Sequence, residues 1–124
     1  MAGTVTPEIP KVFYIKRNDL SPDYIVDVFD NEGEPVNLAG ATAVFSMKGI
    51  TVETLKIDSQ AATVEDGGEG VFNRLRYTWS VGDTDTSGKY NVEFQVSIGG
   101  RPRTYPSNPD QNLQVKITDD LNAA

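Results

Sequence analysis

The sequence contains neither cysteine nor histidine. Without cysteine the fold does not rely on disulfides, and nothing in the chain shows whether its compartment is oxidising or reducing. The two absences together exclude a Ser-His-Asp or Cys-His nucleophile and a zinc site built from thiolates and imidazoles. Most hydrolase classes are therefore excluded. We expect a protein that is not an enzyme and has no cofactor and no metal site.

Long apolar runs and positive charge are also scarce. No stretch of 18 apolar residues occurs, and residues 1–10 have neither the basic start nor the apolar run of a signal peptide. Lys and Arg number 11 against 18 Asp and Glu, which gives a formal net charge of −7. This balance disfavours nucleic acid or anionic lipid as the main partner. We expect no membrane contact and synthesis in the cytoplasm.

What the chain does contain is a series of short strand patterns. Its 124 residues suit a single domain, and its 11 Gly and 7 Pro punctuate runs of β-branched and aromatic residues. The clearest pattern follows Gly88, where every second residue to Ile98 is apolar and the residues between are mainly polar. A second strand pattern ends at Trp79. The predicted core comprises Tyr24, Val26, Val28, Phe45, Tyr77, Trp79, Tyr90, Val92, Phe94, Val96, Leu113 and Val115.

The order of strands and turns predicts an all-β fold, an immunoglobulin-like two-sheet β-sandwich of seven to nine short strands. Residues 1–10 form an extended N-terminal arm, 11–118 the sandwich and 119–124 a C-terminal tail. Residues 30–35 are typical of a tight hairpin turn between neighbouring strands. Asp58-Ser59 separates two weaker strands, and Gly99-Gly100 predicts another hairpin turn.

Four segments in this order resemble a known family: "DNEGEPVNLAGATAVFSM" from residue 30, "GVFNRLRYTW" from residue 70, "VGDTDTSGKYNVEFQV" from residue 81 and "NLQVKI" from residue 112. The chain is similar over residues 11–118 to the immunoglobulin-like N-terminal domain of phage baseplate upper proteins and to related small virion proteins of tailed phages. The matching positions are Asp30, Gly33, Pro35, Val36, Leu38, Gly40, Ala41, Tyr77, Trp79, Asp83, Thr84, Gly88 and Tyr90.

These motif residues also have physical roles of their own. Trp79 is large enough to fill the space between two sheets, and Tyr90 is placed for a tyrosine corner, in which its hydroxyl bonds back to the loop backbone. Asp83, Thr84 and Ser87 can satisfy loop amides. All of these roles maintain the fold.

The resemblance implies a structural component of a tailed-phage virion, located in the tail, the baseplate or the head. Such a protein acts by symmetric docking onto other virion proteins and onto copies of itself, and it is synthesised in the host cytoplasm. One alternative is a capsid decoration protein that stabilises the shell. An alternative of another class is a carbohydrate-binding β-sandwich that stacks exposed aromatic residues such as Tyr14, Phe29 or Tyr105 on sugar rings.

Two further kinds of chemistry are weaker. The acidic residues lie in predicted turns and tails, where solvated side chains are more usual than catalytic ones, and Asp83-Thr84-Asp85 offers oxygen ligands for calcium without the spacing of an EF-hand. Arg74 and Arg76 share one strand face, as do Arg101 and Arg103. Such pairs can bind single-stranded nucleic acid, although pairing with nearby acids is the simpler interpretation.

The predicted interfaces use residues that the core does not need. They lie in the arm, on outward strand faces and on the short strand before the proline-rich segment 106–110. The candidates are Val5, Ile9, Val12, Tyr14, Ile25, Phe29, Arg101, Arg103 and Tyr105.

Overall fold

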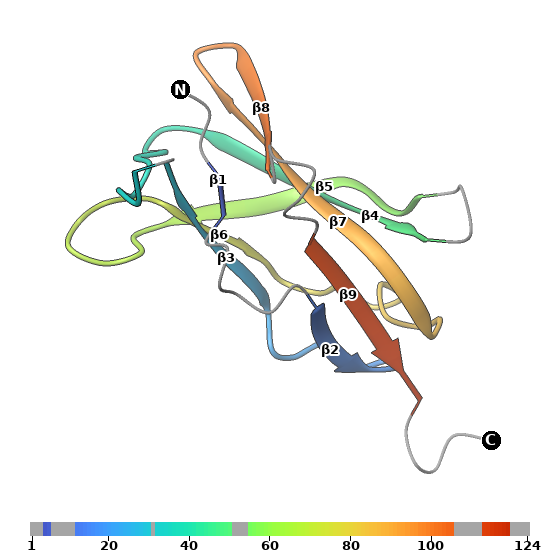
Figure 1. The fold of residues 1–124 in the computed structure, drawn as a ribbon. Coiled ribbons are helices and arrows are strands. Elements are labelled where there is room, and N and C mark those ends of the chain that lie inside the picture. Colours follow the sequence, from blue (N-terminus) through green and yellow to red (C-terminus); the bar gives the residue numbers. More distant parts are fainter. Residues whose placement is uncertain (1–3, 6–11, 31, 51–54, 106–112, 120–124) are drawn as a thin grey trace.

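The computed structural model describes residues 4–5, 12–30, 32–50, 55–105 and 113–119. The predicted all-β class is confirmed, because these residues contain strands and turns and no helix (Figure 1). The nine strands of the described residues are β1 (Thr4–Val5), β2 (Val12–Lys16), β3 (Tyr24–Phe29), β4 (Thr42–Gly49), β5 (Leu55–Glu65), β6 (Arg74–Tyr77), β7 (Gly88–Ile98), β8 (Arg101–Tyr105) and β9 (Leu113–Thr118).

Eight of these strands form one hydrogen-bonded path in the order β1-β3-β6-β5-β4-β7-β9-β2, and β8 pairs with β7 beside the path. The sheet is mixed, since β2 runs parallel to β9 whereas the other pairs are antiparallel. It curls strongly and is nearly barrel-shaped (Figure 1). The described strands thus make one continuous sheet. This pairing does not by itself show the two separate sheets that the sequence predicts.

Strand β5 makes the sheet continuous. Its first part pairs with β4 and its last part with β6, and the register shifts between Phe45 and Met47, opposite residues 57–60. Ser59 has a positive φ of 53°, and its amide donates to the Ser46 hydroxyl at 3.0 Å. The expectation that Asp58-Ser59 ends a strand was wrong. The two residues form a bulge within one long strand, and the strand changes its partner from β4 to β6 farther on, between Ala62 and Thr63.

The core lies between the two parts of the sheet that β5 joins. Tyr24 on β3 stacks on Phe94 on β7 with ring centroids 6.1 Å apart, and Phe45 on β4 stacks on Tyr77 on β6 at 4.3 Å. Trp79 packs against the same cluster, and its indole N–H donates to the Pro22 carbonyl at 2.9 Å. The structure buries all twelve residues predicted for the core, from Val28 at 0% exposed to Tyr90 at 6%.

The loop before β7 is held by the motif residues. The Tyr90 hydroxyl donates to the Thr86 carbonyl at 2.7 Å, which is the tyrosine-corner contact expected from the sequence. The Asp83 carboxylate accepts from the Ser80 amide at 2.7 Å and from the Tyr77 hydroxyl at 2.6 Å. Burial, followed by the bond to Asp83, raises the pKa of Tyr77. These motif residues therefore hold the loop that connects β6 to β7.

The acidic turn, residues 30–35, forms as expected in its described part, residue 30 and residues 32–35, but it is not followed directly by a strand that pairs with β3. Asp30 Oδ1 accepts from the amides of Glu32 and Glu34 at 2.8 and 3.0 Å, and Gly33 has a φ of 83° that favours glycine. The turn closes a short hairpin, with an antiparallel bridge between Phe29 and Pro35 and the Val36 amide donating to the Val28 carbonyl at 3.1 Å. The expectation that it leads directly into the next strand of the sheet as the pairing partner of β3 was wrong. β3 pairs with β1 and β6, and the chain crosses over through residues 36–41 before β4 begins.

The predicted arm contains β1, which pairs with β3 of the same chain through Thr4 opposite Phe29 and Val5 opposite Val28. The rest of the arm, the proline-rich segment 106–110 and tail residues 120–124 lie outside the described residues.

Candidate interaction surface

The second half of β7 continues into β8 as a hairpin. Its turn, Gly99-Gly100, has φ values of 57° and 81°, which suits the type I′ geometry that two-residue hairpins prefer. Ile98 pairs with Arg101 next to the turn, Val96 with Arg103, and Phe94 with Tyr105. In Figure 1 the hairpin projects beyond the rest of the sheet.

Side chains on the inner face of this hairpin change character toward its tip. Alternation places Arg101, Arg103 and Tyr105 on the face shared by Val96 and Ile98, which continues the core face of β7. Val96 and Tyr105 are buried, whereas Ile98 is 41% exposed and both arginines are exposed. The inner face of the hairpin is therefore covered by other residues at its base and is open to solvent toward its tip.

A groove of about 340 Å³ lies along this inner face. Its opposite wall is residues 36–38, which follow the acidic turn directly. The groove is apolar at its base and cationic at its tip. Its lining residues are Val36, Asn37, Leu38, Val96, Ile98, Arg101, Arg103 and Tyr105.

Tyr105 lines this groove but does not present an exposed ring. Its side chain is 0% exposed, and its hydroxyl has no hydrogen-bond partner among the described residues. The expectation that Tyr105 is an exposed interface or sugar-stacking residue was wrong. Its position opposite Phe94 places it at the end of the core, where the hairpin leaves the sheet.

The other alternating arginines have a different environment. Arg74 forms a two-point ion pair with Asp27, at 2.8 and 3.2 Å. Arg76 donates to Asp23 at 2.9 Å and to Glu65 at 2.7 Å. Acids on the strands and loops beside β6 therefore engage both guanidinium groups, and these side chains bridge β3, β6 and β5.

The other interface candidates are spread over the molecule. Tyr14 on β2 is 65% exposed and Ile25 on β3 is 40% exposed, whereas Val12 and Phe29 are half-buried. Val5 lies in β1, whose side chains are outside the described part, and Ile9 lies outside the described residues. Among the described candidates, Arg101, Arg103 and Tyr105 line one groove, and the backbones of Val5 and Phe29 lie on the paired strands β1 and β3. Sequence reasoning missed the facing wall, residues 36–38. One signal was available, because the alternation of apolar residues in β7 continues to Ile98, beyond the last buried residue of that strand, Val96.

A second groove, of about 410 Å³, lies on the outer face of β4, β5 and β7. Its lining is mainly polar and includes no aromatic residue. Tyr14 and Phe29, predicted to stack on sugar, belong to β2 and β3 and do not line it. The lining residues are Val44, Ser46, Lys48, Leu55, Asp58, Ser59, Asn91, Val92, Glu93 and Gln95.

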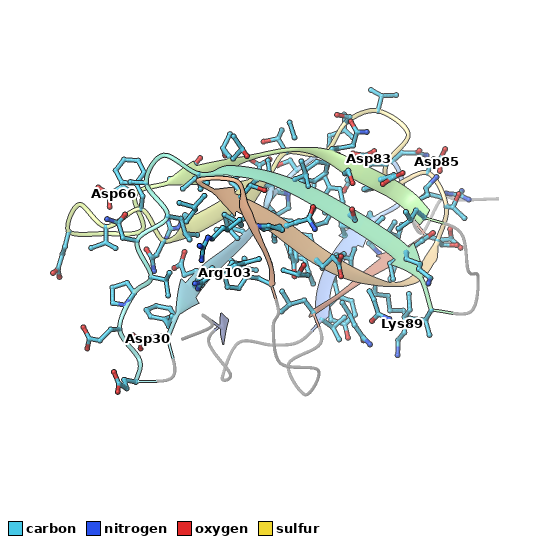
Figure 2. The ribbon with its side chains drawn as sticks, turned by 90° about the horizontal axis from the view of Figure 1, so that it is seen from above. Asp30, Asp66, Asp83, Asp85, Lys89 and Arg103 are labelled. Carbon is cyan, nitrogen blue, oxygen red and sulfur yellow. The ribbon has the colours of Figure 1, made fainter. Side chains whose placement is uncertain are left out.

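The acids in loops have local partners. Asp85 forms an ion pair with Lys56, and this hydrogen bond lowers the pKa of the Asp85 carboxyl. Within the described ranges, no three acidic side chains are grouped so as to hold a metal ion. No helix in the described part is long and apolar enough to cross a bilayer. Figure 2 shows Asp83 and Asp85 at the end of the molecule opposite Asp30 and Asp66.

Comparison with known proteins gives no match, either to a model of a protein family or to a curated protein sequence.

Proposed function

We propose that this protein is a structural component of a tailed-phage virion and acts by symmetric protein–protein docking through the β7–β8 hairpin. The observation that carries the proposal is the hairpin itself, which extends past the core with an apolar base and two arginines on a chain of net charge −7. A projecting surface of this kind contributes little to a monomer. An acidic chain that keeps a local cationic patch beside apolar side chains suits recognition of a complementary protein surface.

We also propose that the curled sheet follows the immunoglobulin-like plan. Strands β1, β3, β6 and the end of β5 supply one layer, and β2, β9, β7, β4 and the start of β5 the other. The parallel pairing of β2 with β9, the Trp79 packing and the tyrosine corner at Tyr90 support this assignment.

The β8 edge favours docking through side chains over addition of a strand. In a two-residue hairpin the pair beside the turn is hydrogen-bonded and the pairs then alternate, so the backbones of Pro102 and Thr104 face away from β7. Pro102 has no N–H to offer a new strand. Recognition at this end therefore falls to Arg101, Arg103 and the groove. β2, at the end of the path, is the better edge for backbone pairing.

The test is electron microscopy of intact phage particles, with the density of this chain assigned and its copies counted. We expect density at a fixed, symmetric copy number with the hairpin end in contact with a neighbour. Density within the capsid lattice would assign the protein to the head, as a decoration protein. Absence of the chain from purified particles would overturn the proposal.

The polar groove on β4, β5 and β7 supports a second candidate, carbohydrate binding. Its amide, hydroxyl and charged side chains, such as Asn91, Gln95 and Glu93, are of the kind that hydrogen-bond sugar hydroxyls. The discriminating experiment is a glycan array with the isolated protein, followed by Asn91→Ala. Specific glycan binding that this substitution abolishes would favour the carbohydrate-binding function, and absence of binding would exclude it.

A further inference from the structure

The groove under the hairpin and the acidic turn are adjacent parts of one surface. Residues 36–38 form one wall of the groove and continue directly from residues 30–35. In Figure 2, Asp30 and Arg103 lie toward one end of the molecule and Lys89 toward the other. One end therefore presents a basic wall and an acidic turn next to each other.

Three charged side chains on this end, Arg101, Glu32 and Glu34, have no ion pair among the residues that the structure describes. Arg101 on the hairpin has no ion pair among the described residues, in contrast to Arg17, Arg74 and Arg76. The side chains of Glu32 and Glu34 are exposed and likewise have no partner in the described part of the chain. Asp30 differs, because its carboxylate holds the turn amides. Asp30 thus holds the backbone of the turn, and the carboxylates of Glu32 and Glu34 are exposed on it.

The groove also supplies apolar contact area. The side chains of Val36, Val96 and Ile98 line it. Val96 is buried, whereas Ile98 next to the turn is 41% exposed, so the apolar surface near the tip is open to a partner.

We propose that this end of the molecule binds the same end of a second copy about a two-fold axis, with the acidic turn of each copy against Arg101 of the other. In such an isologous contact every pair occurs twice, so Arg101 meets Glu34 at two symmetric places. Ile98 and the groove wall supply the apolar part of the interface. This inference rests on the proposed docking function and names its partner.

Charge complementarity favours a second copy over a different protein. Both halves of the match, Arg101 on the hairpin and the acidic turn, are present on the same end of this chain, and the contact pairs both at once. The overall charge of −7 opposes association at long range, but its effect is screened beyond about 8 Å at physiological ionic strength. The contact is expected to be weak, with a Kd of about 10–1000 µM, as for small interfaces.

The test is sedimentation equilibrium of the isolated chain at 0.15 M salt over a range of protein concentrations. The wild type is expected to dimerise reversibly, and Arg101→Glu and Glu34→Arg are each expected to weaken the dimer about tenfold or more, because each places like charges opposite one another. An equimolar mixture of the two variants is expected to recover association, since one native and one exchanged pair then form.

Matched controls are Lys89→Glu and Glu93→Arg, which make the same charge changes at exposed positions outside this end. They are expected to leave the dimer unchanged, and thermal unfolding checks that every variant is folded. A wild type that stays monomeric, a dimer that survives both single reversals, or a mixture of folded variants that stays monomeric would each overturn the proposal. A monomer that is still incorporated into particles would remove this inference and leave the virion function standing.

Discussion

Two segments of the chain carry the same local pattern, arginine at alternate positions of a strand, in different surroundings. Arg74 and Arg76 lie on β6, which has β3 on one side and β5 on the other, and carboxylates on both sides engage them. Arg101 and Arg103 lie on β8, which pairs with β7 alone. The first pair joins strands, and the second projects over a groove.

The difference shows that strand neighbours, more than the local sequence, decide what an exposed arginine does. A central strand offers two sets of cross-strand partners, and a projecting hairpin offers one. The ion pairs on β6 agree with the simpler interpretation of the sequence, in which these arginines pair with nearby acids and do not bind nucleic acid. On β8 the same pattern leaves Arg101 for an external partner.

The largest contrast concerns the residue between the two arginines of each pair. Leu75 is fully buried on β6, whereas Pro102 is exposed on β8. Leu75→Ala is expected to cost about 2–5 kcal/mol of unfolding free energy, because it opens a cavity in the core. Pro102→Ala is expected to stay within about 0.5 kcal/mol. Urea unfolding followed by Trp79 fluorescence measures both, and equal effects would contradict the contrast.

Tyrosines near the two pairs provide the next contrast. The Tyr77 hydroxyl donates to Asp83, so Tyr77→Phe is expected to cost about 1–2 kcal/mol and to weaken the loop before β7. The Tyr105 hydroxyl has no partner in the described residues, so Tyr105→Phe is expected to be neutral or to stabilise the monomer by up to about 1 kcal/mol. Thermal unfolding compares them, and a large loss for Tyr105→Phe would show that its hydroxyl is satisfied within the monomer.

Alkaline pH is expected to lower the stability of the fold through two buried tyrosines, Tyr24 on β3 and Tyr77 on β6. Burial raises the folded-state pKa of both Tyr77 and Tyr24 above the ordinary value of 10.0. Their stability contribution is therefore complete below about pH 10 and is lost as the pH rises toward the folded values, by up to about 1.4 kcal/mol per pH unit for each tyrosine. Urea midpoints between pH 8 and 11 should fall, and the fall should be shallower in Tyr77→Phe. A flat profile would contradict the assignment.

The smallest effects concern the charges themselves. Asp27→Ala removes the two-point partner of Arg74, and a loss of about 0.5–1 kcal/mol is expected for this partly exposed pair. Arg101→Ala is expected to change monomer stability by less than about 0.5 kcal/mol. Urea unfolding at protein concentrations too low for association separates the two cases. An equal loss in both variants would place Arg101 in an ion pair of the monomer.

Much of the fold follows from period-two patterning. Alternation around Phe94 and Leu75 specifies which residues face inward because each strand has one buried face, and the Gly99-Gly100 hairpin follows from turn chemistry. Strand neighbours do not follow, because pairing partners distant in the sequence are set by packing. For this reason the turn after β3 was expected to lead to its pairing partner, and the bulge at Asp58-Ser59 was taken for a strand end.

The candidate site was predictable only in part. The Arg101 and Arg103 alternation marks an outlying strand, but residues 36–38 meet the hairpin through a crossover that no local pattern specifies. Tyr105 was misplaced because the short strand reads as peripheral, although its last residue pairs with Phe94 in the core. Both errors concern contacts between strands that are distant in the sequence, at the end of the sheet where the hairpin leaves the core.

The most direct measurement is the rate at which phenylglyoxal modifies each arginine, read by mass spectrometry at low and at high protein concentration. We predict that Arg74 and Arg76 react slowly at both concentrations, because carboxylates hold them within the chain. Arg101 should react fast in the dilute protein and become protected when the protein is concentrated. Reactivity of Arg101 that does not depend on concentration, or that equals that of Arg74, would contradict the account.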